Sequence, residues 1–67
     1  MPWTPVQLEQ LLRQMAALSR RLSSATALII SSPTTSDVIV SRLQSVPILL
    51  RGLEEQYLRL ADKIDNN

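Results

Sequence analysis

The fold is decided by six residues near the middle of the chain, Ser31-Ser32-Pro33-Thr34-Thr35-Ser36. Serine, threonine and proline favour caps and turns over helix interiors. Thr34 with Asp37 three positions later could open a second helix, and a negative charge is favourable near a helix N-terminus. On both sides of this interruption the apolar residues recur every three or four positions, which is typical of helices and not of strands. The sequence therefore predicts an all-α fold with two helices joined by one turn.

The first helix has a well-marked start. Thr4 is a suitable N-cap, Pro5 suits the first helical position, and Gln7 stands where a capping box needs it. Trp3 and Leu8 are spaced as a hydrophobic staple across this cap. Neither Gly nor Pro occurs between residues 6 and 32. We therefore expect a helix over about residues 5–30.

The second helix, expected over about residues 36–64, is locally weaker. A proline such as Pro47 costs a helix interior about 3 kcal/mol, and a glycine such as Gly52 costs about 1 kcal/mol. Residues 38–40 are all β-branched, which leaves a short strand there as an alternative. The heptad phase of the apolar residues continues across Pro47, so we predict one helix with a kink or break at Pro47.

Each predicted helix carries one heptad row, and we call the two rows together the predicted seam. The seam comprises Leu8, Leu11, Met15, Leu18, Leu22, Ala25 and Ile29, followed by Ile39, Leu43, Val46, Leu50, Leu53, Tyr57, Leu60 and Ile64. If the chain folds back about residue 34, facing residues have numbers that sum to 68, and all seven rungs from Leu8–Leu60 to Ile29–Ile39 match. This agreement predicts an antiparallel helical hairpin, similar to a coiled coil, as a single domain over residues 1–67.

Seven apolar residues lie off this seam and form a candidate partner or dimer surface: Leu12, Leu28, Ile30, Val40, Ile48, Leu49 and Leu58. Ordering 67 residues requires about 4,000 Å² of buried apolar surface, which a lone chain with two aromatic residues and no Cys will struggle to supply. A second copy would cover the surplus and give a homodimeric four-helix bundle. The small residues Ala16, Ala17, Ser19, Ser23, Ser24 and Ala27 either permit close helix approach or are ordinary helix filler.

The inventory of catalytic groups is nearly empty. The chain has no His or Cys to act as base, nucleophile or soft metal ligand, and Lys63 is its only lysine. A phosphate-binding loop needs more glycine than Gly52 alone. We interpret Glu54, Glu55, Asp62 and Asp65 as a solvated helix face. The sequence therefore predicts a protein that is not an enzyme and that uses no cofactor, metal or small-molecule substrate.

Three arginines have no acidic residue three or four positions away, namely Arg20, Arg21 and Arg42. Glu9 and Arg13 form an i,i+4 pair, as do Glu55 and Arg59. The unpaired arginines could serve solubility, could orient an antiparallel dimer whose far half is acidic, or could contact nucleic-acid phosphates. A net charge of +1 is low for a nucleic-acid-binding protein.

We therefore predict a small protein–protein interaction module, such as a regulator, adaptor or chaperone-like subunit, that acts through self-association and an apolar helical face. The alternative is an RNA-binding dimer of hairpins with Arg20, Arg21 and Arg42 on phosphates. Attachment of the first helix to a membrane surface through Trp3 is a third and weaker hypothesis. The absence of a secretory signal and of a long apolar run predicts a cytoplasmic location.

Overall fold

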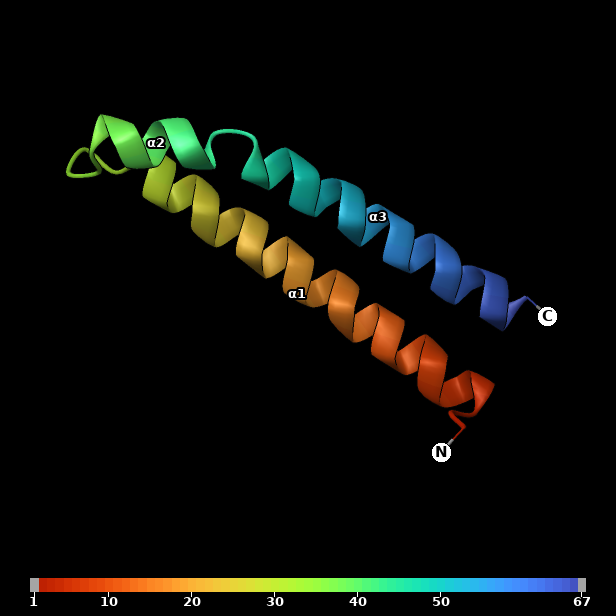
Figure 1. Cartoon of the computed structure of the whole chain (residues 1–67). Coiled ribbons are helices and arrows are strands. Elements are labelled where there is room, and N and C mark those ends of the chain that lie inside the picture. Colours follow the sequence, from red (N-terminus) through yellow and green to blue (C-terminus); the bar gives the residue numbers. More distant parts are fainter. Residues whose placement is uncertain (1, 67) are drawn as a thin grey trace.

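The computed structural model describes residues 2–66 and is a helical hairpin (Figure 1). Its helices are α1 (Pro5–Ser31), α2 (Asp37–Leu43) and α3 (Val46–Asp65), and α1 packs along α3. The hairpin measures 47 × 20 × 15 Å, and its radius of gyration is 15.4 Å, against about 11 Å for a compact domain of this length. No strand occurs within residues 2–66, so the alternative of a strand at residues 38–40 is wrong, and the two-helix architecture is confirmed.

The start of α1 follows the predicted capping box. The backbone N–H of Gln7 donates to the Thr4 hydroxyl at 3.2 Å, and the backbone N–H of Thr4 donates to the side-chain oxygen of Gln7 at 3.0 Å. These two bonds satisfy amide groups that no helical carbonyl can reach. The first helix therefore begins at Pro5, as its sequence predicts.

The turn is held by hydroxyl groups of the interrupting residues. The Thr35 hydroxyl donates to the carbonyl of Ile29 at 2.6 Å, and the Ser32 amide donates to the same carbonyl at 3.2 Å. Ser36 caps α2, because its hydroxyl accepts the amide of Ile39 at 3.4 Å. The suggestion that Thr34 caps the second helix is therefore wrong by two residues. Asp37 still lies in the first turn of α2, where its charge is favourable.

The expected kink or break appears as a bend at Gln44 and Ser45, between α2 and α3. Pro47 lies in the first turn of α3. Proline has no amide hydrogen, so in an unbroken helix Pro47 would leave the carbonyl of Leu43 without its donor. Ending α2 at Leu43 moves Pro47 into a first turn, where that hydrogen is not needed.

The contact between α1 and α3 differs from the predicted seam. On α1 a row of covered residues repeats at the same three-four spacing but stands one position later, and we call it the contact line: Glu9, Leu12, Ala16, Ser19, Ser23, Thr26 and Ile30. Ala17, next to this line, is also partly covered. Ala16, Ser19 and Ser23 are buried, with exposed fractions of 2, 6 and 3%. Ala61 of α3 is fully buried. Small side chains therefore occupy the most buried positions between the two helices.

The register between the helices also shifts slightly from the prediction. The Ser23 hydroxyl donates to the carbonyl of Pro47 at 3.2 Å. Facing residues therefore have numbers that sum to about 70 instead of 68. Because the serine side chain is short, this bond also requires the backbones of the two helices to lie close together at Ser23. Close approach is the role that the small residues at 16, 19 and 23 have in this fold.

Candidate interaction surface

The seven α1 residues of the predicted seam are all exposed, and we call them the leucine row: Leu8, Leu11, Met15, Leu18, Leu22, Ala25 and Ile29. Their large members have exposed fractions between 36% for Met15 and 54% for Leu18. Each stands one position before a residue of the contact line and so lies on one flank of α1, beside α3 but not between the helices. The prediction that this row closes the hairpin is wrong, because the shift of one residue turns it toward one side.

On α3 the predicted seam divides into two groups. Val46, Leu50, Tyr57 and Ile64 are partly covered, as a contact with α1 requires. Leu53 and Leu60 remain 40% and 49% exposed. Of the seam residues before α3, Leu43 is partly covered, whereas Ile39 of α2 is 46% exposed.

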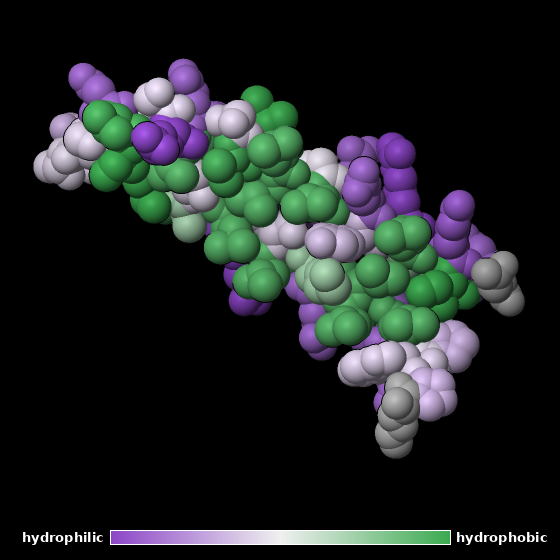
Figure 2. All heavy atoms as spheres, viewed as in Figure 1, coloured by the Kyte–Doolittle hydropathy of each residue, from purple (hydrophilic) through white to green (hydrophobic). Residues whose placement is uncertain are grey.

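The exposed apolar residues of α1 and α3 lie on the same side of the hairpin. Leu49, Leu53 and Leu60 each come one position before a covered residue of α3. Because the helices are antiparallel, the residues preceding the contact positions of both helices point to one common side. The space-filling view shows this side as a nearly continuous apolar surface along both helices (Figure 2). We call the leucine row together with Leu49, Leu53 and Leu60 the apolar face.

A shallow hollow lies on α3 at the edge of this face, lined by Ile48, Leu49, Gly52, Leu53 and Gln56. Apart from the two adjacent residues and the nearby backbone of α3 itself, no atom lies within 4 Å of the position that a Cβ at Gly52 would occupy. The hollow is open to solvent and offers room for an apolar side chain of a partner, as a gap between helical side chains does in knobs-into-holes packing.

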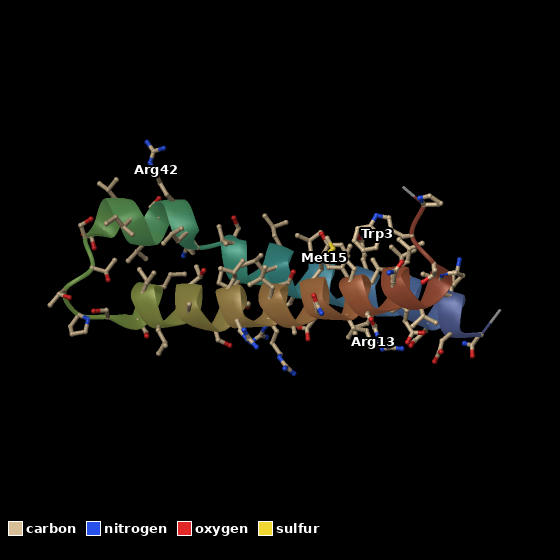
Figure 3. All side chains as sticks on the ribbon, turned by 90° about the horizontal axis from the view of Figure 1, so that it is seen from below. Trp3, Arg13, Met15 and Arg42 are labelled. Atoms are coloured by element: carbon tan, nitrogen blue, oxygen red, sulfur yellow. The ribbon has the colours of Figure 1, made fainter. Side chains whose placement is uncertain are left out.

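The opposite side of the hairpin is charged. Arg13 points away from the side that carries Met15 and Trp3 (Figure 3). Its guanidinium lies 3.2 Å from Asp62, 3.5 Å from Glu9 and 3.9 Å from Asp65. The hydrogen bond to Asp62 is the main reason why the pKa of Arg13 is raised above its ordinary value, and Glu9 adds to the effect. The predicted Glu9–Arg13 pair is confirmed, and its extension to α3 is a feature that local spacing alone did not reveal.

The structure does not bring the three unpaired arginines onto one surface. Arg42 extends from α2 on the side of Met15 and Trp3 (Figure 3). Arg20 stands two helical turns after Arg13 and therefore lies on Arg13's side of α1. Arg21 lines a separate shallow hollow with Gln14, Ala17 and Leu18. A single phosphate-binding patch made of all three arginines is therefore not formed by one hairpin.

The candidate partner surface proposed from the leftover apolar residues is likewise divided. Leu12 and Ile30 belong to the contact line, and Val40 is partly covered. Leu28 and Ile48 are 72% and 74% exposed but lie outside the apolar face, and Leu58 is 37% exposed on the charged side. Only Leu49 joins the apolar face. Leu12 and Ile30, which were expected on the outer surface, are thus covered within the hairpin, whereas the α1 residues that were expected between the helices are exposed. Hydrophobicity alone does not show whether a residue is covered by its own chain or by another one.

No family model, curated protein or solved structure matches this chain. Within residues 2–66, no helix is long and apolar enough to cross a membrane. The same part of the chain contains no group of three or more acidic side chains placed to hold a metal ion. The physical properties of the hairpin surface are therefore the basis of the functional proposal.

Proposed function

We propose that this chain is a non-enzymatic protein–protein interaction module that self-associates through its apolar face. The observation that carries the proposal is the exposure of one continuous apolar row on α1, from Leu8 to Ile29, beside three exposed leucines of α3. Scattered exposed leucines are common on proteins, but a row of this length on one side marks an interaction surface. The dimeric four-helix bundle is the simplest arrangement that covers such a face on a hairpin.

The exposed surface area of the chain is consistent with an interface large enough for a second copy. The chain exposes 5456 Å², whereas a folded monomer of its 7.5 kDa mass typically exposes about 4,200 Å². The excess is about 1,200 Å² per chain. Stable homodimers bury about 2,000 Å² or more in total, or about 1,000 Å² per chain. A second copy could therefore cover as much surface as the hairpin has in excess.

The chemical character of the face also suits a homodimer. The leucine row contains no charged or polar side chain, and the charged cluster around Arg13 lies on the opposite side. The centres of homodimer interfaces are depleted in charge and are more apolar than the rest of a protein surface. In a pair formed through the apolar face, the charged sides of both hairpins remain in contact with water.

The test compares two leucine substitutions by light scattering coupled to size-exclusion chromatography. Leu18→Glu places a charge at the middle of the leucine row, and Leu28→Glu places the same charge on the same helix at a 72% exposed position outside the apolar face. We expect the unmodified chain and Leu28→Glu to be dimers and Leu18→Glu to be a monomer. Circular dichroism reports whether each variant remains helical. Equal masses for both variants, or a monomeric unmodified chain, would contradict the proposal.

The same experiment addresses RNA binding through absorbance at 260 and 280 nm. A dimer that carries excess 260 nm absorbance at low salt, and loses it at high salt, would have bound nucleic acid through phosphate contacts. If that absorbance also disappears in the triple variant Arg20→Ala, Arg21→Ala and Arg42→Ala, these arginines are the contacts. We expect protein absorbance alone.

A further inference from the structure

The two halves of the hairpin carry opposite charges. The half that includes the turn, residues 19–51, has four arginines against one aspartate, for a net charge of +3. The half that includes both chain ends, residues 1–18 and 52–67, has three basic and five acidic side chains, for a net charge of −2. Together the two halves give the net charge of +1 for the whole chain. A second copy is electrostatically complementary to this hairpin when it is reversed end for end.

From this polarity we infer that the two copies stack face to face in antiparallel orientation, with α1 lying along α1 of the second copy and Leu18 close to the two-fold axis. This inference rests on the proposed function, because it specifies how the apolar faces meet. In the reversed arrangement the positive half of each hairpin lies over the negative half of the other. A head-to-head pair would instead place the +3 halves together and the −2 halves together, and halves of like net charge repel each other.

The leucine row is compatible with this two-fold symmetry. When α1 is paired with a reversed copy of itself about Leu18, Leu8 comes level with Ile29, Leu11 with Ala25, and Met15 with Leu22. Every residue of the row then meets a residue of the same row to within about one position. An isologous interface requires this property, since each patch must fit itself.

Arg42 of α2 lies near the turn of the hairpin, so its position relative to the second copy differs between the two orientations. It points to the side of the apolar face (Figure 3). In the antiparallel pair it comes level with the last turn of α3 of the second copy, whose Asp62 and Asp65 lie on the charged side of that hairpin and contact Arg13 there. In a head-to-head pair it would stay within the positive half of both copies. Arg42 therefore contributes to orientation through the net charge of its half of the hairpin and not through a direct ion pair.

The two orientations differ in which helices touch. Face-to-face stacking of reversed hairpins brings α1 onto α1 and α3 onto α3, whereas head-to-head stacking brings α1 onto α3. By the register of the Ser23–Pro47 hydrogen bond, Leu18 is level with residue 52 of its own hairpin, next to Leu53. The antiparallel pair therefore places Leu18 near Leu18 and Leu53 near Leu53. The head-to-head pair places Leu18 near Leu53 of the second copy.

Disulfide cross-linking of single-cysteine variants distinguishes these cases, because the chain has no Cys of its own. Leu18→Cys and Leu53→Cys are oxidised separately and as a mixture, with Leu28→Cys as the control outside the apolar face. We expect each of the first two variants to form a covalent dimer alone and Leu28→Cys to form none, since a disulfide needs Cα atoms within about 7 Å. A covalent dimer only in the mixture would overturn the antiparallel orientation.

A second pair of variants keeps the test informative if Leu18→Cys or Leu53→Cys fails to fold, as judged by circular dichroism. Leu11→Cys and Ala25→Cys come level with each other in the antiparallel pair, so we expect a covalent dimer in their mixture and none from either alone. The absence of a covalent dimer in the mixture, which the head-to-head pair predicts, or covalent dimers from each variant alone, would overturn the inference. The mass of the reduced proteins distinguishes a wrong orientation from a failure of self-association. A dimer with the wrong cross-links contradicts only the orientation, whereas a monomer contradicts self-association itself.

Discussion

The contact line and the leucine row are neighbouring rows of one helix with the same three-four spacing, yet they differ in nearly every other respect. The centre of the contact line is small and buried at Ala16, Ser19 and Ser23. The leucine row is large, apolar and 36 to 54% exposed at its leucines, Met15 and Ile29. At its centre the helix therefore presents small side chains to α3 and large apolar side chains to the outside.

This difference shows that close approach and hydrophobic coverage are separate requirements. Small residues let two helix backbones come near each other, but they bury little apolar area. Among residues 2–66, only Ala16, Ser19, Ser23 and Ala61 are buried, and none of the four has a large apolar side chain. Such a fold has little core of its own, so covering the leucine row is expected to supply much of its stability.

A leucine placed in the contact line removes the size difference between the two rows. We expect Ala16→Leu to destabilise the fold by about 1–3 kcal/mol or more, because overpacking forces apart two helices that meet through small residues. Ala27→Leu is the matched control, since Ala27 lies on the same helix and is exposed. Thermal unfolding followed by circular dichroism should show a large drop in Tm for Ala16→Leu alone. Equal Tm values for both variants would contradict the packing role of the small residues.

The leucine row can be examined without any substitution by varying the protein concentration. If folding is coupled to dimerisation, a tenfold increase in concentration shifts the unfolding equilibrium by about 1.4 kcal/mol per dimer and raises Tm. The Leu18→Glu variant should unfold at a lower Tm that no longer depends on concentration. A Tm of the unmodified chain that is constant over two decades of concentration would mean that the row is not covered by a second copy.

Pro47 tests whether the bend between α2 and α3 belongs to the fold. Because Pro47 lies in the first turn of α3, its ring fits the helical backbone there and also reduces the number of conformations open to the unfolded chain. We expect Pro47→Ala to lower stability by about 0.4–1 kcal/mol. The measurement is chemical denaturation at fixed protein concentration. A rise in stability would indicate instead that α2 and α3 would form one unbroken helix if proline did not prevent it.

The smallest effect is expected on the charged side. Arg13→Gln removes the contacts to Glu9, Asp62 and Asp65, but exposed ion pairs contribute little and are screened by salt. The raised pKa of Arg13 implies that deprotonation of this side chain removes its contribution only when the pH rises above the ordinary arginine pKa. We therefore expect a slight fall in Tm that shrinks at high salt. A loss of the dimer would contradict the assignment of this side as non-interacting.

Much of the architecture could be predicted from particular residues. Thr4 and Gln7 predict the start of α1, the six residues around Pro33 predict the turn, and Pro47 predicts a disturbance that the structure places at Gln44 and Ser45. These signals are local, because each depends on bonds within a few residues along the chain. The end of α1 at Ser31 and the cap at Ser36 fall within two residues of the expected boundaries.

The side on which the helices meet could not be predicted in the same way. Hydrophobic spacing is the same for a row buried inside the hairpin and for a row buried against another chain, since both repeat every three or four residues. The deciding feature was the stripe of Ala16, Ser19 and Ser23, whose small size could also have been ordinary helix composition. Only the three-dimensional register, fixed near Ser23 and Pro47, distinguishes the two rows.

Coverage of the leucine row by a second copy is measured most directly through the accessibility of individual leucine methyl groups. In a methyl NMR spectrum recorded with a soluble paramagnetic probe, exposed methyl groups broaden and covered ones do not. We predict that the methyl signals of Leu11, Leu18 and Leu22 remain sharp, whereas those of Leu28 broaden strongly. Broadening of the row to the same extent as Leu28, in a sample concentrated enough for NMR, would contradict self-association through the apolar face.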